Sequence, residues 1–184
     1  AGKVLVFLNT AQHTQRFIHE HTDAISCVAV SPNGRWVASG QYGLTPKIVV
    51  TDATTLKVVR VIDGFHRRSI DALAFSSDST FLATAGGDDE HCVAVYNWRD
   101  ASIAALTPTG QGKVLDIAFA PSSSPFFFLS CGTAASGPPT FWVRQGRNLL
   151  GHRAQLNKQA KAGTCLCAAF VGNCAVVGRA DGHM

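Results

Sequence analysis

The feature of this sequence that most constrains its fold is an internal repeat of about 45 residues. The stretch HTDAISCVAVSPNGRWVASG, residues 21–40, is followed 45 residues later by HRRSIDALAFSSDSTFLATA, residues 66–85. A third copy begins with VLDIAFAPSSSPFFFLSCG at Val114 and has two residues inserted in its turn. A fourth copy, TCLCAAFVGNCAVVGRADG, begins at Thr164 and supplies only two strands. Such a chain is expected to build one supersecondary unit several times over.

Each copy has the same internal order of apolar and polar segments. A short alternating run leads through a polar turn to a second apolar run that ends in small residues, and a third run follows. The tight turns SPNG, residues 31–34, and SSDS, residues 76–79, favour hairpins. A period of 40 to 45 residues with about four strands is typical of a β-propeller blade. A β-sandwich is the main alternative, but sandwiches do not repeat in this register, so the sequence predicts an all-β fold of four-stranded antiparallel blades.

Composition and cysteine usage fit a folded domain. The chain has 184 residues, of which 46% are hydrophobic and 15% charged, a balance typical of globular proteins. No apolar run approaches the roughly 18 residues that span a bilayer, and AGKVLVFLNT is too short for a secretory signal. The six cysteines form no CxxC pair and are expected to be buried, free thiols. We therefore expect a soluble intracellular protein that is an excerpt of a longer chain, with no membrane partner.

The residues around the repeat resemble WD-repeat blades. In that family a loop His, a Ser or Thr of the second strand, a turn Asp and the Trp of a Trp-Asp ending form a buried hydrogen-bond network. The resemblance implies His21 and Ser39 in the first unit, with Thr51 replacing the Trp and no turn Asp, so that its network is incomplete. It implies Trp142 in the third unit, without the His. In the second unit it implies His66, Thr84, Asp88 or Asp89, and Tyr96.

A narrower resemblance covers almost the whole chain. The segments VLVFLN, TQRFIHEHTDAISCVAVSPNGRWVASGQ, DDEHCVAVYNW and TFWVRQGRNLL are similar to the echinoderm microtubule-associated protein-like family. That resemblance implies tandem propellers that associate with tubulin and microtubules. Ciliary WD-repeat proteins of doublet microtubules are the second resemblance. The chain departs from the first family at residues 41–47, where the loop is short, and at Thr51.

The repeat count predicts how much of a propeller is present. WD-repeat rings close with about seven or eight blades, whereas this chain holds about three and a half. We expect one partial propeller over residues 1–184 that forms an open arc, whose last unit lacks its third and fourth strands. The expected units are a leading strand at 1–20 and blades at 21–65, 66–112, 113–163 and 164–184, the last incomplete.

Candidate chemistry is sparse in this sequence. The cluster DDEH, residues 88–91, has metal-ligand side chains, but it falls in a hairpin turn without a second ligand cluster. HEH, residues 19–21, lacks further ligands, and His21 has a structural role in the WD pattern. TGQGKV, residues 109–114, lacks the GxxxxGK[ST] of a phosphate loop, and no GxSxG elbow is present. We therefore predict a non-enzymatic protein without cofactor or metal.

Charge is distributed unevenly along the chain. Residues 1–116 have ten Lys or Arg and eleven Asp or Glu, whereas residues 117–184 have six and one. A long connection after the third unit is predicted to carry the five cations Arg144, Arg147, Arg153, Lys158 and Lys161. They form either a partner-binding face for an acidic polymer or a solvated loop with accidental bias. The segment lacks the interleaved aromatics that stack on bases, which argues against nucleic acid, and the family resemblance favours tubulin.

Two functions are therefore predicted from different classes. The first is a cytoskeletal protein that binds tubulin or the microtubule lattice, located in the cytoplasm and cytoskeleton and, for a ciliary member, in the axoneme of a cilium or flagellum. The second is a general WD-repeat scaffold that holds other proteins together without affinity for microtubules. Co-sedimentation with polymerised tubulin separates them.

Overall fold

The computed structural model describes residues 2–110, 112–121, 124, 126–155 and 163–180. Strands make up almost all of its regular structure, and one 3-10 turn, η1 (Ala134–Ser136), joins the second and third strands of the third repeat. The strands are β1 (Leu5–Asn9), β2 (Thr14–Ile18), β3 (Ile25–Val30), β4 (Trp36–Gly43), β5 (Ile48–Asp52), β6 (Val58–Ile62), β7 (Arg68–Phe75), β8 (Phe81–Gly86), β9 (Val93–Asn97), β10 (Ser102–Thr107), β11 (Val114–Phe119), β12 (Phe128–Gly132), β13 (Thr140–Gln145), β14 (Asn148–Arg153), β15 (Cys165–Val171) and β16 (Cys174–Arg179).

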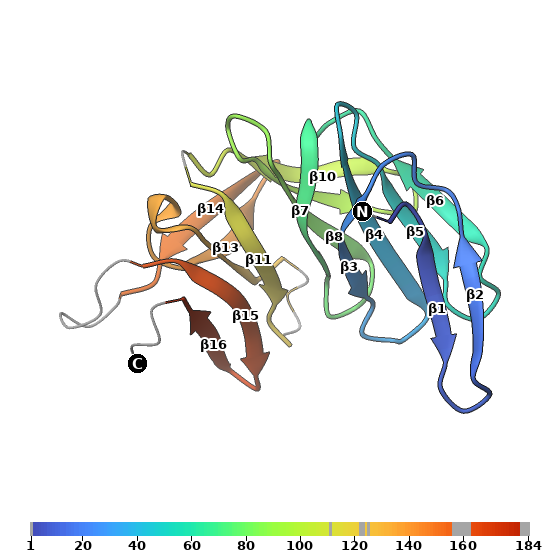
Figure 1. Cartoon of the computed structure of the whole chain (residues 1–184). Helices are drawn as coiled ribbons and strands as arrows, with labels where there is room; N and C mark the ends of the chain where they lie inside the picture. Colours follow the sequence, from blue (N-terminus) through green and yellow to red (C-terminus); the bar gives the residue numbers. More distant parts are fainter. Residues whose placement is uncertain (1, 111, 122–123, 125, 156–162, 181–184) are drawn as a thin grey trace.

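The repeats fold into antiparallel meanders that fan out side by side (Figure 1). Blade 1 consists of β3–β6, blade 2 of β7–β10 and blade 3 of β11–β14, and in each blade every strand pairs with the next. The fourth repeat contributes the hairpin β15–β16. Neighbouring blades are joined at their edges by short pairings of β4 with β7 and of β10 with β14. The predicted all-β propeller fold in an open arc is confirmed.

The N-terminal segment differs from its prediction. Residues 1–20 were expected to hold one leading strand, but the structure places two strands there, β1 and β2, which form a hairpin of their own. Asn9 caps the turn, because its side chain accepts hydrogen bonds from the backbone amides of Ala11 and Gln12 at 3.0 and 2.9 Å. An Asx-type turn of this kind reverses the chain, so the segment is too bent to run as a single strand.

The core is divided into the layers between the blades. Between blades 1 and 2, the rings of Trp36 and Trp98 lie with their centroids 5.0 Å apart, and Tyr96 packs in the same buried layer. Between blades 2 and 3, small residues such as Ala83 oppose Phe128 and Trp142. Because successive residues of a strand point to opposite faces, β9 sends Tyr96 toward blade 1 and Val95 toward blade 3. This alternation explains why the repeated strands are apolar on both faces.

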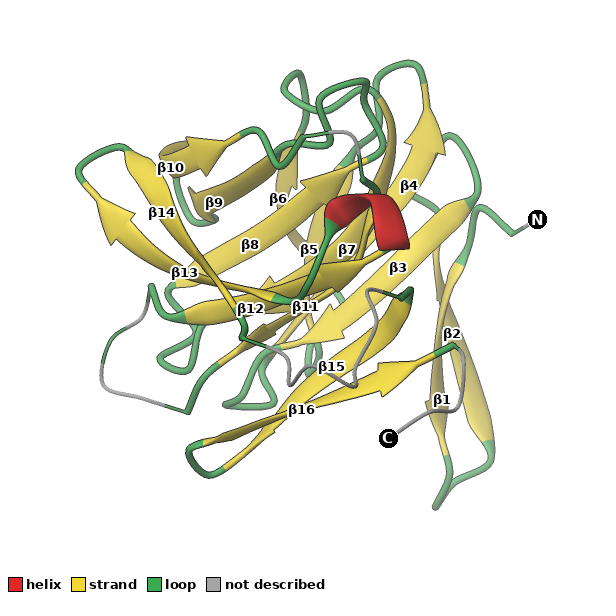
Figure 2. Ribbon diagram, turned by 90° about the vertical axis from the view of Figure 1, so that its left-hand side faces the viewer, coloured by secondary structure: helices red, strands yellow, loops and turns green. Residues whose placement is uncertain are grey.

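Polar contacts also link the innermost strands of neighbouring blades. Ser26 donates a hydrogen bond to the carbonyl oxygen of Ile70, which joins blade 1 to blade 2. Nζ of Lys113 lies 3.1 Å from Oδ1 of the buried Asp71, at the junction of blades 2 and 3. Oδ2 of Asp116 accepts a hydrogen bond of 2.8 Å from the amide of Ala168 on β15. The strands β3, β7, β11 and β15 follow one another along the arc (Figure 1). Figure 2 views the same blades from the end of the arc that carries β15 and β16.

Apolar side chains are exposed at the two ends of the arc. Val28 and Val30 of β3 are 50% and 61% exposed, and Leu166 and Val171 of β15 are 53% and 70% exposed. The equivalent surfaces between the blades are buried, so these end faces resemble blade interfaces in composition. Among the described residues no helix is long and apolar enough to cross a bilayer.

Candidate functional site

The loops that connect β4 to β5, β8 to β9 and β12 to β13 lie at one end of the blades, together with the segments that lead into β3, β7 and β11. This follows from the antiparallel meander, in which alternate turns fall on opposite edges. We call this end the network edge, because it holds the buried His side chains of blades 1 and 2. The turns from first to second and from third to fourth strand lie at the opposite end, the turn edge.

Blade 1 contains a hydrogen-bond network around His21 at the network edge. Nε2 of His21 lies 2.7 Å from Oγ of Ser39, and its Nδ1 lies 2.8 Å from Oε1 of Gln41. The Gln41 amide group also donates to Oγ1 of Thr22 at 3.0 Å. The expectation of an incomplete network holds at the Trp position, where Thr51 stands, but not for the turn Asp, whose place the amide of Gln41 takes. Thr51, in the Trp position, is buried, and its hydroxyl finds no hydrogen-bond partner among the residues that the structure describes.

In blade 2 the imidazole of His66 also contacts a hydroxyl, but its second hydrogen-bond partner is a carboxylate instead of an amide. Nε2 of His66 lies 2.7 Å from Oγ1 of Thr84, and its Nδ1 lies 3.4 Å from Oδ2 of Asp88. Burial alone would raise the pKa of Asp88, but the hydrogen bonds from His66 and from the Cys92 amide outweigh it and hold that pKa below its usual value. Asp89 instead pairs with Arg68 at 2.6 Å in the solvent, so only one of the two candidate carboxylates reaches the imidazole.

Tyr96 occupies the Trp position of blade 2 and is buried at 2% exposure. Tyr96 pairs across the strands with Leu82, and Leu82 lies two residues before Thr84 in β8. Burial raises the pKa of Tyr96 well above its ordinary value, so its hydroxyl is neutral. The ring fills the layer toward blade 1, and packing is the contribution that the structure shows for this side chain.

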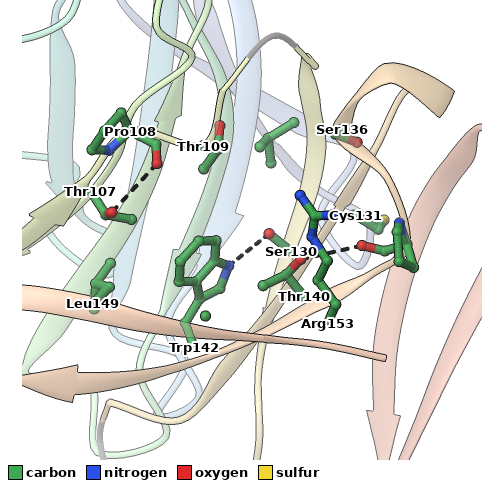
Figure 3. A pocket seen from close by; sticks show the side chains of 13 residues that line it. Thr107, Pro108, Thr109, Ser130, Cys131, Ser136, Thr140, Trp142, Leu149 and Arg153 are labelled. Carbon is green, nitrogen blue, oxygen red and sulfur yellow. Dashed lines mark hydrogen bonds between the residues drawn. The ribbon is translucent and has the colours of Figure 1, made fainter. Parts of the chain in front are cut away.

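Blade 3 has the Trp but not the His. The indole N–H of Trp142 donates to Oγ of Ser130 at 2.8 Å, and Ser130 pairs with Thr140 across the strands just as Ser39 pairs with Val49. The position that aligns with His21 and His66 is Gly110. Beside Ser130 and Trp142 lies a pocket of about 280 Å³ (Figure 3). The close-up draws the Arg153 side chain along the pocket wall on the side of Ser130 and Cys131.

The basic residues lie in a different place from the one predicted. Arg144, Arg147 and Arg153 do not lie in a loop after the third unit but on the outer hairpin β13–β14 of blade 3 and its turn. The reason is that TFWVRQ and NLLGHR form the third and fourth strands of the blade. Lys158 and Lys161 lie outside the described residues.

The three described arginines do not form one cluster. Arg144 and Arg147 lie at the turn edge, whereas Arg153 pairs with Thr140 at the network edge. Arg144 lies four positions after Thr140 along β13, a distance of about 13 Å at about 3.3 Å per residue. The guanidinium of Arg144 stacks 4.5 Å above the ring of Phe126, and all three side chains belong to exposed residues. Charges on this hairpin are therefore presented at both edges of the blade.

Two residues of the site were not singled out from the sequence. Gln41 was overlooked because the WD pattern asks for a carboxylate in the following turn, whereas Gln41 is an amide within the second strand. Trp98 follows the third strand of blade 2 and is 1% exposed, with its indole N–H donating to the carbonyl of Ser79 at 3.0 Å. The buried indole of Trp98 packs against Trp36 between blades 1 and 2, at the turn edge.

A set of four-stranded blades with buried His–hydroxyl pairs at one edge defines a WD-repeat β-propeller protein. Residues 14–184 match the family model of the Echinoderm microtubule-associated protein first beta-propeller. The chain therefore belongs to that family, as the sequence resemblance predicted.

Comparison with known proteins gives the same family. The chain is 30% identical to Echinoderm microtubule-associated protein-like 4 of Xenopus tropicalis, covering 94% of this chain and 19% of that protein. It is 27% identical to Echinoderm microtubule-associated protein-like 1 of Homo sapiens, covering 94% of this chain and 22% of that protein. The chain thus spans about a fifth of the length of these relatives.

A solved structure supports the fold. A chain in the crystal structure of the Mitotic Checkpoint Complex superimposes with a TM-score of 0.71 at 18% identity, covering 90% of this chain and 49% of the other. At that identity the likeness speaks for the propeller fold and not for a shared activity.

Proposed function

We propose that this chain is a non-enzymatic part of a microtubule-associated protein and contributes to binding tubulin or the microtubule lattice. The observation that carries the proposal is the match of residues 14–184 to the first propeller of a family named for microtubule association. The relatives that bear this name share the sequence over nearly all of this chain. Cytoplasm and cytoskeleton follow as the proposed location, and the axoneme of a cilium or flagellum for a ciliary member.

The distribution of charge supports a basic contact surface on blade 3. Between Asp116 and Asp181 the sequence has no acidic residue. The strands of blade 3 that follow β11 therefore contain no carboxylate that could neutralise the exposed arginines of β13–β14. Attraction between such a surface and an acidic polymer decays over about 8 Å at physiological ionic strength. Binding that uses this surface weakens as salt is added.

Co-sedimentation with polymerised tubulin across a salt series tests the proposal. In one variant Arg144, Arg147, Arg153, Lys158 and Lys161 are replaced by Gln. A matched control replaces five exposed cations of the first half of the chain by Gln: Lys3, Arg16, Lys57, Arg60 and Arg67. Loss of affinity with a flatter salt dependence in the first variant, and not in the control, supports the contact.

A second function remains as the alternative, a WD-repeat scaffold for other proteins without affinity for microtubules. Its support is the propeller fold itself, which serves many partners. If the unmodified chain stays in the supernatant at every salt concentration, the lattice-binding proposal fails and the scaffold is favoured. If it sediments but both five-residue variants behave alike, the contact lies on the blades and not on these cations.

A further inference from the structure

The pocket of blade 3 adjoins the hydroxyl that a buried imidazole contacts in the other two blades. In blades 1 and 2, Nε2 of the His approaches the hydroxyl of Ser39 or Thr84 at 2.7 Å. Ser130 has the same place in the β12–β13 pairing, but within the described part of the chain its partner is the indole of Trp142 and not an imidazole. A cavity of about 280 Å³ adjoins it instead. This volume is near the lower end of the range for ligand pockets, and it suits a group of side-chain size.

Ser130 brings an unused hydrogen-bond donor to this pocket. An indole N–H can only donate, so Oγ of Ser130 accepts the bond from Trp142 and its own hydrogen is left over. Among the described residues no acceptor for that hydrogen is found, although Ser130 is 5% exposed. The neighbouring hydroxyls of Thr140 and Thr109 use their hydrogens on the carbonyl oxygens of Pro138 and His91. A buried polar group of this kind is stabilised by a partner.

The charge of the pocket favours an anion. Of the described residues that line the pocket, Arg153 is the charged one and none is a carboxylate. In the part of the chain that the structure describes, no carboxylate lies within 4 Å of the Arg153 guanidinium. A planar guanidinium matches the two oxygens of a carboxylate.

We propose that this pocket binds a carboxylate group, with the guanidinium of Arg153 and the hydroxyl of Ser130 as donors. One carboxylate occupies the two donors, and the rings and methyl groups of Trp142, Leu149 and Val114 contact the carbon chain behind it. The carboxylate is supplied either by an acidic side chain of a partner protein or by a free small acid. The inference stands on the pocket alone and does not depend on microtubule binding.

Fluorescence anisotropy with a labelled peptide of alternating Glu and Gly tests this site in the whole chain. Arg153→Gln is expected to weaken binding roughly tenfold or more, because it removes a charge-assisted hydrogen bond. Thr109→Trp is expected to weaken it similarly by filling the pocket without changing the net charge. Arg60→Gln, the same charge change on exposed strand β6, is the matched control and is expected to leave affinity unchanged. Displacement of the peptide by free glutarate identifies a small acid as a sufficient ligand, and peptide binding that glutarate does not displace identifies an acidic protein segment.

Three results would overturn the site. The first is that a peptide with Gln in place of Glu binds as tightly as the Glu peptide, and the second is that Arg60→Gln weakens binding as much as Arg153→Gln does. The third is that neither the Glu peptide nor glutarate binds at millimolar concentration. Unchanged binding by Thr109→Trp, with thermal unfolding like that of the unmodified chain, would also overturn it. If Thr109→Trp does not fold, Arg153→Glu on the exposed end of β14 takes its place and must abolish binding. Failure of microtubule co-sedimentation alone leaves the pocket untouched, so the two proposals fail separately.

Discussion

Nδ1 of His21 lies 2.8 Å from Oε1 of Gln41, on the opposite side of the ring from Ser39. An amide oxygen only accepts hydrogen bonds, so Nδ1 carries the hydrogen and Nε2 accepts from the Ser39 hydroxyl. Burial lowers the pKa of His21 below its ordinary value of 6.5, partly opposed by the bond to Gln41. The folded state of blade 1 therefore favours the neutral imidazole of His21 over the protonated one.

Replacement of Gln41 by Ala is expected to destabilise the chain by about 1–3 kcal/mol, because the buried Nδ1–H is left without an acceptor. Gln15→Ala on the exposed strand β2 is the matched control and should change the free energy of unfolding by no more than about 0.5 kcal/mol. Urea unfolding followed by circular dichroism measures both. Equal effects of the two substitutions would show that the Gln41 bond contributes nothing to stability.

The lowered pKa of His21 predicts how stability depends on pH. Below the unfolded value of 6.5 the unfolded chain binds more protons at this site than the folded chain does. The contribution of the neutral ring is therefore complete above pH 6.5 and is lost as pH falls toward the folded pKa. Carboxyl groups with lowered pKa values, such as Asp88, act in a separate window below about pH 4.

Urea unfolding between pH 7.5 and 5 checks this dependence. The unmodified chain is expected to lose stability over this range, and His21→Asn, which does not titrate, is expected to show a flatter profile. His13→Asn, at an exposed position in the β1–β2 turn, serves as the control and should keep the slope of the unmodified chain. A slope that survives in His21→Asn would assign the pH dependence to another group.

Gly86 of blade 2 has the same position as Gln41 of blade 1. Gly86 pairs with Ile70 and Gln41 pairs with Ile25, and these two Ile residues are equivalent in the first strands of their blades. A Cβ at Gly86 would clash with Nδ1 of His66. We expect Gly86→Ala to cost about 1–3 kcal/mol by displacing the imidazole from Thr84. Gly2→Ala, where a Cβ meets nothing within 4 Å, is the control. A neutral Gly86→Ala would mean that His66 has room to move without losing its bonds.

The blades could be predicted from the sequence because their determinants are local and repeated. Alternation, turn residues and the 45-residue offset fix which residues pair, and the matching positions of Ser39, Thr84 and Ser130 confirm that register. The β1–β2 hairpin was not predicted, because it occurs once and its turn depends on the Asn9 side chain rather than on a Gly or Pro.

The edges of the blades were harder to predict than the strands. The sequence groups Arg144, Arg147 and Arg153 within ten positions, but a hairpin sends the first two to one edge and the third to the other. The pocket could not be read from the sequence either. The third repeat has Gly110 at the position that aligns with His21 and His66, and a missing imidazole leaves no motif.

The junction of blade 3 with the fourth repeat depends on Asp116. Its Oδ2 accepts the Ala168 amide at 2.8 Å and its Oδ1 accepts the amide of Ile117 at 2.9 Å. Asp116→Ala removes this side-chain bond between β11 and β15, and we expect a loss of about 1–3 kcal/mol of local stability. The expected result is faster hydrogen exchange across β15–β16, measured by mass spectrometry, while blade 1 keeps its protection.

Two substitutions make this experiment decisive. Asp63→Ala changes the net charge in the same way at an exposed position between β6 and β7 and should leave exchange in β15–β16 unchanged. Asp116→Asn retains an oxygen that accepts from Ala168 and should recover part of the protection, because the amide group offers one acceptor instead of two. If Asp116→Ala exchanges no faster than the unmodified chain, the fourth repeat is held by the packing of Phe170 on Phe127 and not by this carboxylate. If exchange rises equally in blade 1, the bond supports the whole arc rather than its last junction.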